Sequence, residues 1–115
     1  MAVISRTSTK KGSWLIFEWL AATEADTFQD IYLNHNVSDI FMEVEGTFGS
    51  ATVTINGWVV TEAAEVALVD PAGTAVSLTA DGNSAIRDAY PAMRPIHSGG
   101  SSETIDVRIY MKIVQ

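Results

Sequence analysis

The sequence contains no cysteine and only two histidines among its 115 residues. Without cysteine, a disulfide scaffold, a thiol nucleophile and a cysteine-ligated metal site are all excluded. The histidines, His35 and His97, are not spaced as metal ligands, and each is expected to be a solvated loop residue rather than a catalytic base. The sequence also has no phosphate-binding loop, dinucleotide fingerprint or nucleophile elbow. We therefore predict no catalytic residue, no cofactor and no metal site.

Basic side chains and long hydrophobic runs are also scarce. The chain has 7 Lys and Arg against 14 Asp and Glu, a formal net charge of −7. A chain this acidic is not expected to bind nucleic acid or an anionic membrane. The apolar stretch 14–17 is interrupted at once by Glu18, and no run is long enough to cross a bilayer. The sequence therefore predicts a soluble protein that does not pass through a secretory route.

Three of the seven positive charges lie near the beginning of the chain, before a long stretch without Lys or Arg that ends at Arg87. They are Arg6, Lys10 and Lys11. Because residues 5–13 are rich in Ser, Thr and Lys and have little to bury, residues 1–12 are predicted to form an exposed basic arm. Residues 13–115 are long enough for a single domain. The arm is either a frayed terminus or a segment that docks on an acidic face of this chain or of a neighbouring subunit.

Alternating apolar and polar residues predict β-strands. The clearest run is 105–113, where every second residue is apolar and the others are mostly polar. Further strands are predicted at 14–20, 28–33, 39–45 and 50–55, and a hairpin at 65–69 and 74–79. A short helical turn is expected at 84–89, ended by Pro91.

Turn residues separate these runs. The segment 70–73, Asp-Pro-Ala-Gly, has the signature of a type I turn, and Asn56-Gly57 is a strong turn dipeptide. Seven or eight short strands with such turns predict an all-β fold, an antiparallel β-sandwich of jelly-roll type. A closed barrel is the second choice.

The acid-rich middle of the chain is interpreted as a solvated face. Asp39, Glu43 and Glu45 point to the same side of the strand predicted at 39–45, where like charges repel. This side is therefore expected to be exposed or to be matched by a cation, such as the basic arm. Two other interpretations need features that the sequence does not show: converging carboxylates for glycoside hydrolysis, or the further ligands of a calcium loop.

Several aromatic side chains lie at strand positions that are not expected to face the core of a two-layer sandwich. Segment 14–17 is apolar on both faces, although a sandwich strand buries only one. Phe41 lies among the acids of the strand at 39–45. We expect these positions to contact another subunit or a larger assembly. With the basic residues of the arm, the interface candidates are Arg6, Lys10, Lys11, Trp14, Phe17, Trp19 and Phe41.

Four segments between residues 45 and 111 resemble small β-sandwich structural proteins of tailed bacteriophages. They are 45–55 (EGTFGSATVTI), the turn 69–73 (VDPAG), 76–82 (VSLTADG) and 93–100 (MRPIHSGG), ahead of the final alternating strand. Head decoration (cement) proteins are the most similar class, followed by neck or tail accessory proteins. The chain departs from the pattern at 56–58, where the family has a longer polar loop before a Trp.

The resemblance implies a non-enzymatic virion component, assembled in the host cytoplasm, that stabilises the head shell. Its partners would be the major capsid protein or other virion proteins and further copies of itself, as a trimer by analogy. A carbohydrate-binding module is an alternative, with Trp58 and Tyr90 as the leading exposed rings. A small jelly-roll hydrolase or lyase is the weakest alternative, because no His pair or metal-ligand spacing is present.

Overall fold

The computed structural model describes residues 3–23, 26–33, 36–59 and 64–114. These residues form eleven strands and no helix, and none of them belongs to a helix long and apolar enough to span a membrane. The strands are β1 (Val3–Ile4), β2 (Thr7–Lys11), β3 (Trp14–Ala22), β4 (Thr27–Phe28), β5 (Ile31–Tyr32), β6 (Val37–Thr47), β7 (Thr52–Trp58), β8 (Val66–Ala67), β9 (Gly82–Ile86), β10 (Ala92–Ser98) and β11 (Thr104–Ile113).

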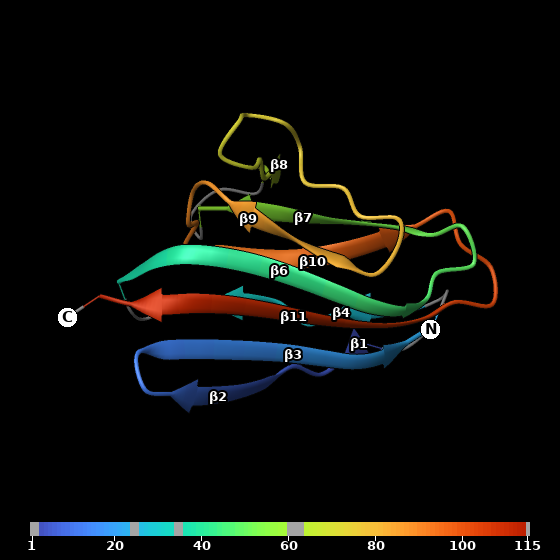
Figure 1. The fold of residues 1–115 in the computed structure, drawn as a ribbon, viewed down its shortest axis with the longest axis horizontal. Coiled ribbons are helices and arrows are strands. Elements are labelled where there is room, and N and C mark those ends of the chain that lie inside the picture. Colours follow the sequence, from blue (N-terminus) through green and yellow to red (C-terminus); the bar gives the residue numbers. More distant parts are fainter. Residues whose placement is uncertain (1–2, 24–25, 34–35, 60–63, 115) are drawn as a thin grey trace.

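Two antiparallel sheets lie one behind the other (Figure 1). The five-stranded sheet has the order β2-β3-β11-β6-β9, and the four-stranded sheet has the order β5-β10-β7-β8. A short parallel pair, β1 with β4, lies beside them. The predicted all-β, antiparallel fold is confirmed in this sandwich-like arrangement. Four strands are only two residues long, which is why the sequence predicts seven or eight. The jelly-roll connection remains a prediction.

The core lies between the two sheets and follows the predicted alternation. In β11 the side chains at 105, 107, 109, 111 and 113 are buried, and those between them are not. In β3 the buried side chains are Leu15, Phe17, Trp19 and Ala22, and in β6 they are Ile40, Met42 and Val44. Because side chains alternate across a strand, the residues between these buried positions lie on the outer face of the five-stranded sheet.

Two β-bulges bend the five-stranded sheet. The pairing of β11 with β3 shifts between Ile105 and Val107, and the pairing with β6 shifts between Met111 and Lys112. Ala21 and Asp39 lie opposite these shifts and have left-handed backbone conformations, with φ of 58° and 48°. Asp tolerates this conformation better than Ala does, since its side chain bonds locally. The backbone N–H of Ala21 is held by the Asp106 carboxylate at 2.8 Å.

Two local predictions are wrong because pairing with distant residues overrides the local signal. Asn56-Gly57 is not a turn but part of β7, paired with both β10 and β8. Glycine is needed there, because a Cβ at Gly57 would lie 2.8 Å from the Tyr90 side chain that packs over it. The predicted helical turn at 84–89 overlaps β9, which pairs with β6. The type I turn at 70–73 is confirmed by the Gly73 N–H that donates to the Asp70 carbonyl at 2.9 Å.

The beginning of the chain is exposed, as expected of an arm, but it is also part of a sheet. All five residues of β2 are exposed, and the strand pairs with β3 from Thr7↔Glu18 to Lys11↔Trp14. Arg6 anchors its start, with the guanidinium 5.4 Å from the Phe17 ring centroid and Nε donating to the Asp30 carbonyl at 3.1 Å. The segment 7–11 is therefore the edge strand of the five-stranded sheet rather than a detached arm.

Candidate functional site

The outer face of the five-stranded sheet carries its side chains in a fixed order along the strands. The strand register places Lys11 and Lys112 beside Trp14, then Ile16 beside Tyr110 and Phe41, and then Glu18 beside Arg108 and Glu43. Asp106 and Glu45 follow as the next pair. We call the three parts the basic end (Lys11 and Lys112), the aromatic patch (Trp14, Ile16, Phe41 and Tyr110) and the acidic end (Glu18, Glu43, Glu45, Asp106 and Arg108).

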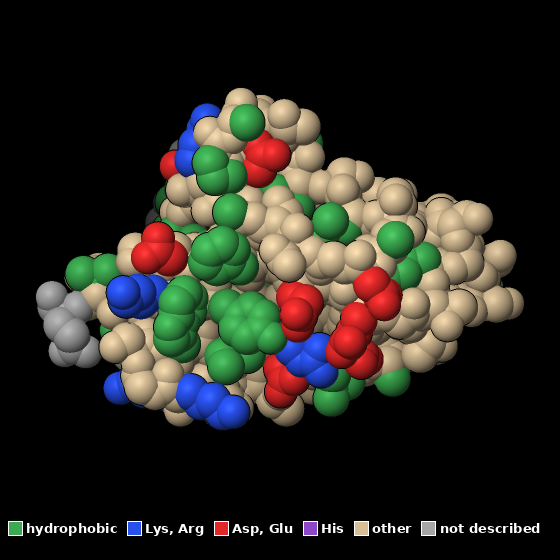
Figure 2. Space-filling view, viewed as in Figure 1, with side chains coloured by type: hydrophobic (Ala, Val, Ile, Leu, Met, Phe, Trp, Pro, Cys, Tyr) green, Lys and Arg blue, Asp and Glu red, His purple; other side chains and the backbone are tan. Residues whose placement is uncertain are grey.

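The aromatic patch surrounds an open hollow of about 440 Å³. Figure 2 shows it as a group of hydrophobic side chains, with basic side chains and an acidic one on one side and a mixed cluster of acidic and basic side chains on the other. Phe41 is 38% exposed, and its ring centroid lies 6.3 Å from that of Trp14 at an interplanar angle of 42°. Lys11, Glu43 and Asn83 also line the hollow. Exposed aromatic rings on a rigid sheet are typical of binding surfaces.

Tyr110 connects the aromatic patch to the acidic end. Its hydroxyl donates a hydrogen bond to Glu43 at 3.0 Å. Partial burial, followed by this hydrogen bond and the negative charge of Glu43, raises the pKa of Tyr110 above its ordinary value. The phenol therefore stays protonated, and remains a donor, throughout the neutral pH range.

The acidic end is organised by a single cation. The Arg108 guanidinium lies 2.6 Å from Glu18, 2.6 Å from Glu45 and 3.6 Å from Glu43. Hydrogen bonds to Glu45 and Glu18 raise the pKa of Arg108, so it is charged at all accessible pH values. The sequence predicted that Asp39, Glu43 and Glu45 would be exposed or matched by a cation. Arg108 of the last strand, rather than the basic arm, pairs with Glu43 and Glu45, whereas Asp39 is exposed at the bulge of β6 opposite Met111 and Lys112. One guanidinium does not neutralise the four carboxylates, so this end of the face is negative.

Two of the predicted interface residues are not available to a partner. Phe17 is 5% exposed and Trp19 is fully buried, because both lie on the side of β3 that faces the core. The Trp19 indole N–H donates to the Gln29 carbonyl at 3.0 Å inside the molecule. These two predictions are therefore wrong. The other face of the same strand, with Trp14, does contribute to the outer surface, as does Phe41 from β6.

The three basic interface candidates, Arg6, Lys10 and Lys11, lie in different parts of the fold. Lys11 is paired with Trp14 and belongs to the outer face, whereas Lys10 is paired with Leu15, whose side chain points to the core side of the sheet. Both lysines are exposed. The Arg6 side chain contacts the Phe17 ring and donates a hydrogen bond to the Asp30 carbonyl. These contacts hold the first strands in place.

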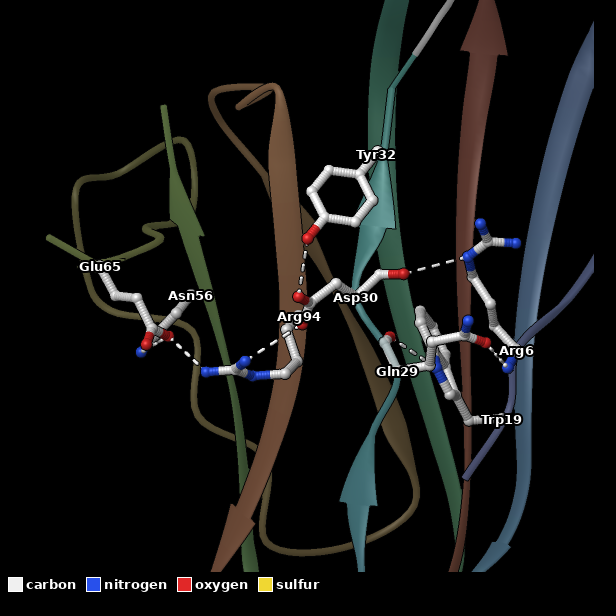
Figure 3. Close-up of polar contacts among 8 residues, drawn as sticks. All are labelled: Arg6, Trp19, Gln29, Asp30, Tyr32, Asn56, Glu65 and Arg94. Carbon is white, nitrogen blue, oxygen red and sulfur yellow. Dashed lines mark hydrogen bonds and ion pairs between the residues drawn. The ribbon is translucent and has the colours of Figure 1, made fainter. Parts of the chain in front are cut away.

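A second polar cluster lies beside the four-stranded sheet (Figure 3). Arg94 of β10 is 3.1 Å from Asp30 and 2.8 Å from Glu65, and Asp30 also accepts a hydrogen bond from Tyr32. This hydrogen bond raises the pKa of Tyr32. The cluster borders a hollow of about 530 Å³. Its charged groups already pair with one another across three segments, so we interpret it as a connection between segments of the fold.

The rings of Trp58 and Tyr90, which were proposed to bind a carbohydrate, both make contacts within the fold. The Arg94 guanidinium lies over the Trp58 ring, 5.3 Å from its centroid. Tyr90 is only partly exposed and packs against Gly57 and the core. Trp58 and Tyr90 are thus engaged within the fold, and the aromatic group that is open to a ligand is the aromatic patch.

The prediction that His97 is solvated is wrong. Its side chain is 3% exposed and contacts Glu103 through Nδ1, while Nε2 lies 2.6 Å from the Asp26 carbonyl and the ring packs edge-on against Phe28. This buried pair secures the connection between β10 and β11. His35, the other predicted loop histidine, lies outside the described residues. Among the residues that the structure does describe, no group of three His, Cys, Asp or Glu is placed to hold a metal ion.

Sequence reasoning missed Tyr110, Arg108 and Asn83 as members of the outer face. The first two were visible as the polar side of the alternating run 105–113, but their neighbours depend on the register between strands. That register joins residues more than sixty positions apart, such as Arg108 and Glu43.

No protein-family model matches the sequence, and neither the curated proteins nor the solved structures compared with it include a match. The resemblance to tailed-phage virion proteins therefore remains a prediction.

Proposed function

We propose that the chain is a non-enzymatic structural component of a tailed-phage particle, and specifically a head decoration protein that stabilises the shell. The observation that supports this proposal best is the outer face, where an exposed aromatic patch lies between a basic and an acidic end. It is carried by β3, β6 and β11, the three longest strands of the fold. Side chains on a continuous sheet are held more rigidly than side chains on loops, which suits a permanent protein contact.

The proposal assigns the outer face to contacts between proteins in the particle. Aromatic and Arg side chains contribute most to such contacts, and the surrounding charges select the partner and its orientation. The resemblance in residues 45–111 points to head decoration before a neck or tail position. Both positions require the same kind of compact β-fold, so they are distinguished by where the protein is found in the particle.

The test is occupancy on purified particles. Particles of a tailed phage that carries this coding sequence are stripped of the chain, and purified protein is added back. Trp14→Ser and Phe41→Ser are expected to reduce rebinding about tenfold or more, because each removes an aromatic ring, half-buried in Trp14 and exposed in Phe41, from the aromatic patch. Tyr32→Ser is the matched control, since Tyr32 is 55% exposed but lies on the four-stranded sheet. Equal rebinding of all three variants contradicts the assignment of the face, and no rebinding of the wild-type chain contradicts the proposed function.

A carbohydrate-binding role is the second candidate, and the hollow itself favours it. Three aromatic rings and the polar side chains of Lys11, Glu43 and Asn83 meet there, a combination that also suits a sugar. The 42° angle between the Trp14 and Phe41 rings makes a poor flat platform, which places this candidate second. Tryptophan fluorescence titrated with a panel of polysaccharides separates the two: a saturable change that is lost in Trp14→Ser supports the sugar, and an unchanged spectrum supports the protein contact.

A further inference from the structure

We propose that the outer face binds a second copy of this chain, in a two-fold symmetric contact that places the basic end of each copy on the acidic end of the other. This inference rests on the proposed function, because it names the partner of the same face. The order of charges along the strands indicates that the partner is a second copy of the chain.

The charge order is set by the strand register. Along β11 the outward residues are Asp106, Arg108, Tyr110 and Lys112 in turn, so the acidic and basic ends are separated by the length of the aromatic patch. Asp106 and Lys112, the outermost charges of this row, are six residues apart, which is about 20 Å at the rise of a β-strand. Lys11 of β2 joins Lys112 at the basic end, and Glu18 of β3 and Glu45 of β6 join Asp106 at the acidic end.

Only one orientation of two facing copies satisfies this order. One possible two-fold axis lies in the plane of the contact and runs across the strands, through the aromatic patch. This axis places Lys11 and Lys112 of each copy over the acidic end of the other copy. An axis that runs along the strands instead places Lys on Lys and Glu on Glu, which is repulsive. In the favoured orientation the two aromatic patches meet at the centre and exclude water from Phe41 and Trp14, where binding energy concentrates in protein interfaces.

This contact favours a dimer over the trimer expected by analogy. A two-fold contact uses the same patch on both copies, whereas a closed trimer joins two different patches on each copy. The outer face is complementary to itself, with opposite charges at its two ends. Two sheets that pack face to face with nearly aligned strands are also a common arrangement in β-proteins.

The test is sedimentation equilibrium of the full-length chain with charge-reversal variants. The wild-type chain is expected to sediment as a dimer. Lys112→Glu and Glu45→Lys, each alone, are expected to weaken the dimer about tenfold or more, because each places like charges together in both symmetric contacts. The double variant Lys112→Glu with Glu45→Lys is expected to recover most of the affinity, since the charges are exchanged rather than lost.

Lys10→Glu is the matched control, because Lys10 is the same kind of exposed residue on the opposite side of the sheet. It is expected to leave the dimer unchanged, and circular dichroism confirms that each variant is folded. A wild-type monomer or trimer overturns the proposal. So does a double variant as weak as the single ones, or an equal effect of Lys10→Glu.

The two proposals fail in different ways. A chain that is monomeric in solution but abundant in purified particles refutes the self-contact and leaves the structural function in place. A chain that dimerises through this face but is absent from particles refutes the structural function and leaves the self-contact in place.

Discussion

Ala21 is a residue in a backbone conformation that its side chain disfavours. Its φ of 58° lies in the left-handed region, which costs a non-glycine residue about 1 kcal/mol. We expect Ala21→Gly to raise the free energy of unfolding by about 0.5–1 kcal/mol, measured by urea denaturation. Ala85→Gly in β9 is the control, and it should lower stability because glycine weakens an ordinary strand position. A loss of stability in Ala21→Gly contradicts the expectation.

The buried pair of His97 and Glu103 is expected to contribute strongly to stability. Glu103 is 2% exposed, and its carboxylate fills the space that a Cβ at Gly100 would occupy. Glu103→Ala leaves a buried imidazole without this hydrogen-bond partner, so we expect a loss of about 1–3 kcal/mol in chemical denaturation. Glu65→Ala, at a more exposed ion pair, should cost less than about 1 kcal/mol. Equal small losses in the two variants would mean that the pair is not structurally important.

Tyr110 gives the outer face a measurable pH signature. Its pKa is raised in the folded protein, so the folded state favours the protonated phenol. The interactions that raise the pKa therefore stabilise the folded state. This stabilisation is fully present below about pH 10, the ordinary Tyr pKa, and is lost as the pH rises through the raised pKa of Tyr110. Ultraviolet titration at alkaline pH should therefore show two late-ionising tyrosines, Tyr110 and Tyr32, of which one disappears in Tyr110→Phe and the other in Tyr32→Phe. A variant that removes only a normally titrating tyrosine contradicts the Glu43 contact.

Among the strands, β2 protects an edge. It covers one side of the nine-residue β3 and is itself short, polar and rich in Lys, features that discourage pairing with other molecules. Deleting residues 1–11 uncovers β3, so we expect aggregates in light scattering. Deleting only residues 1–5 retains β2 and Arg6 and should leave the protein free of aggregates. Aggregation of both variants, or of neither, argues against this role of β2.

The strands that sequence reasoning identified best are those whose own side chains carry the signal. In β3, β6 and β11 the alternation of apolar residues predicts the buried face correctly, because the period of two depends only on the strand itself. Gly57, His97 and residues 84–86 were misinterpreted because their roles are decided by partners far along the chain, which are Tyr90 for Gly57, Asp26 and Phe28 for His97, and β6 for residues 84–86. The outer face was predicted in part for the same reason: Trp14 and Phe41 stand out locally, but Arg108 and Tyr110 join them only through the register.

For the molecule as a whole, the core and the outer face have separate tasks. The inward side chains of both sheets form one continuous core, which holds the five-stranded sheet rigid. The opposite side of that sheet has exposed rings and unbalanced charges that the fold itself does not require. A protein whose stability comes from one face and whose contacts come from the other suits a component of a large assembly.

The most direct test of the proposed function is the copy number of this chain in purified particles. Tailed-phage particles that carry the coding sequence are purified, and quantitative mass spectrometry gives the ratio of this chain to the major capsid protein. A head decoration protein is expected in many copies, at a fixed ratio to the capsid protein. Complete absence from intact particles contradicts the virion function, whatever the chain does in solution.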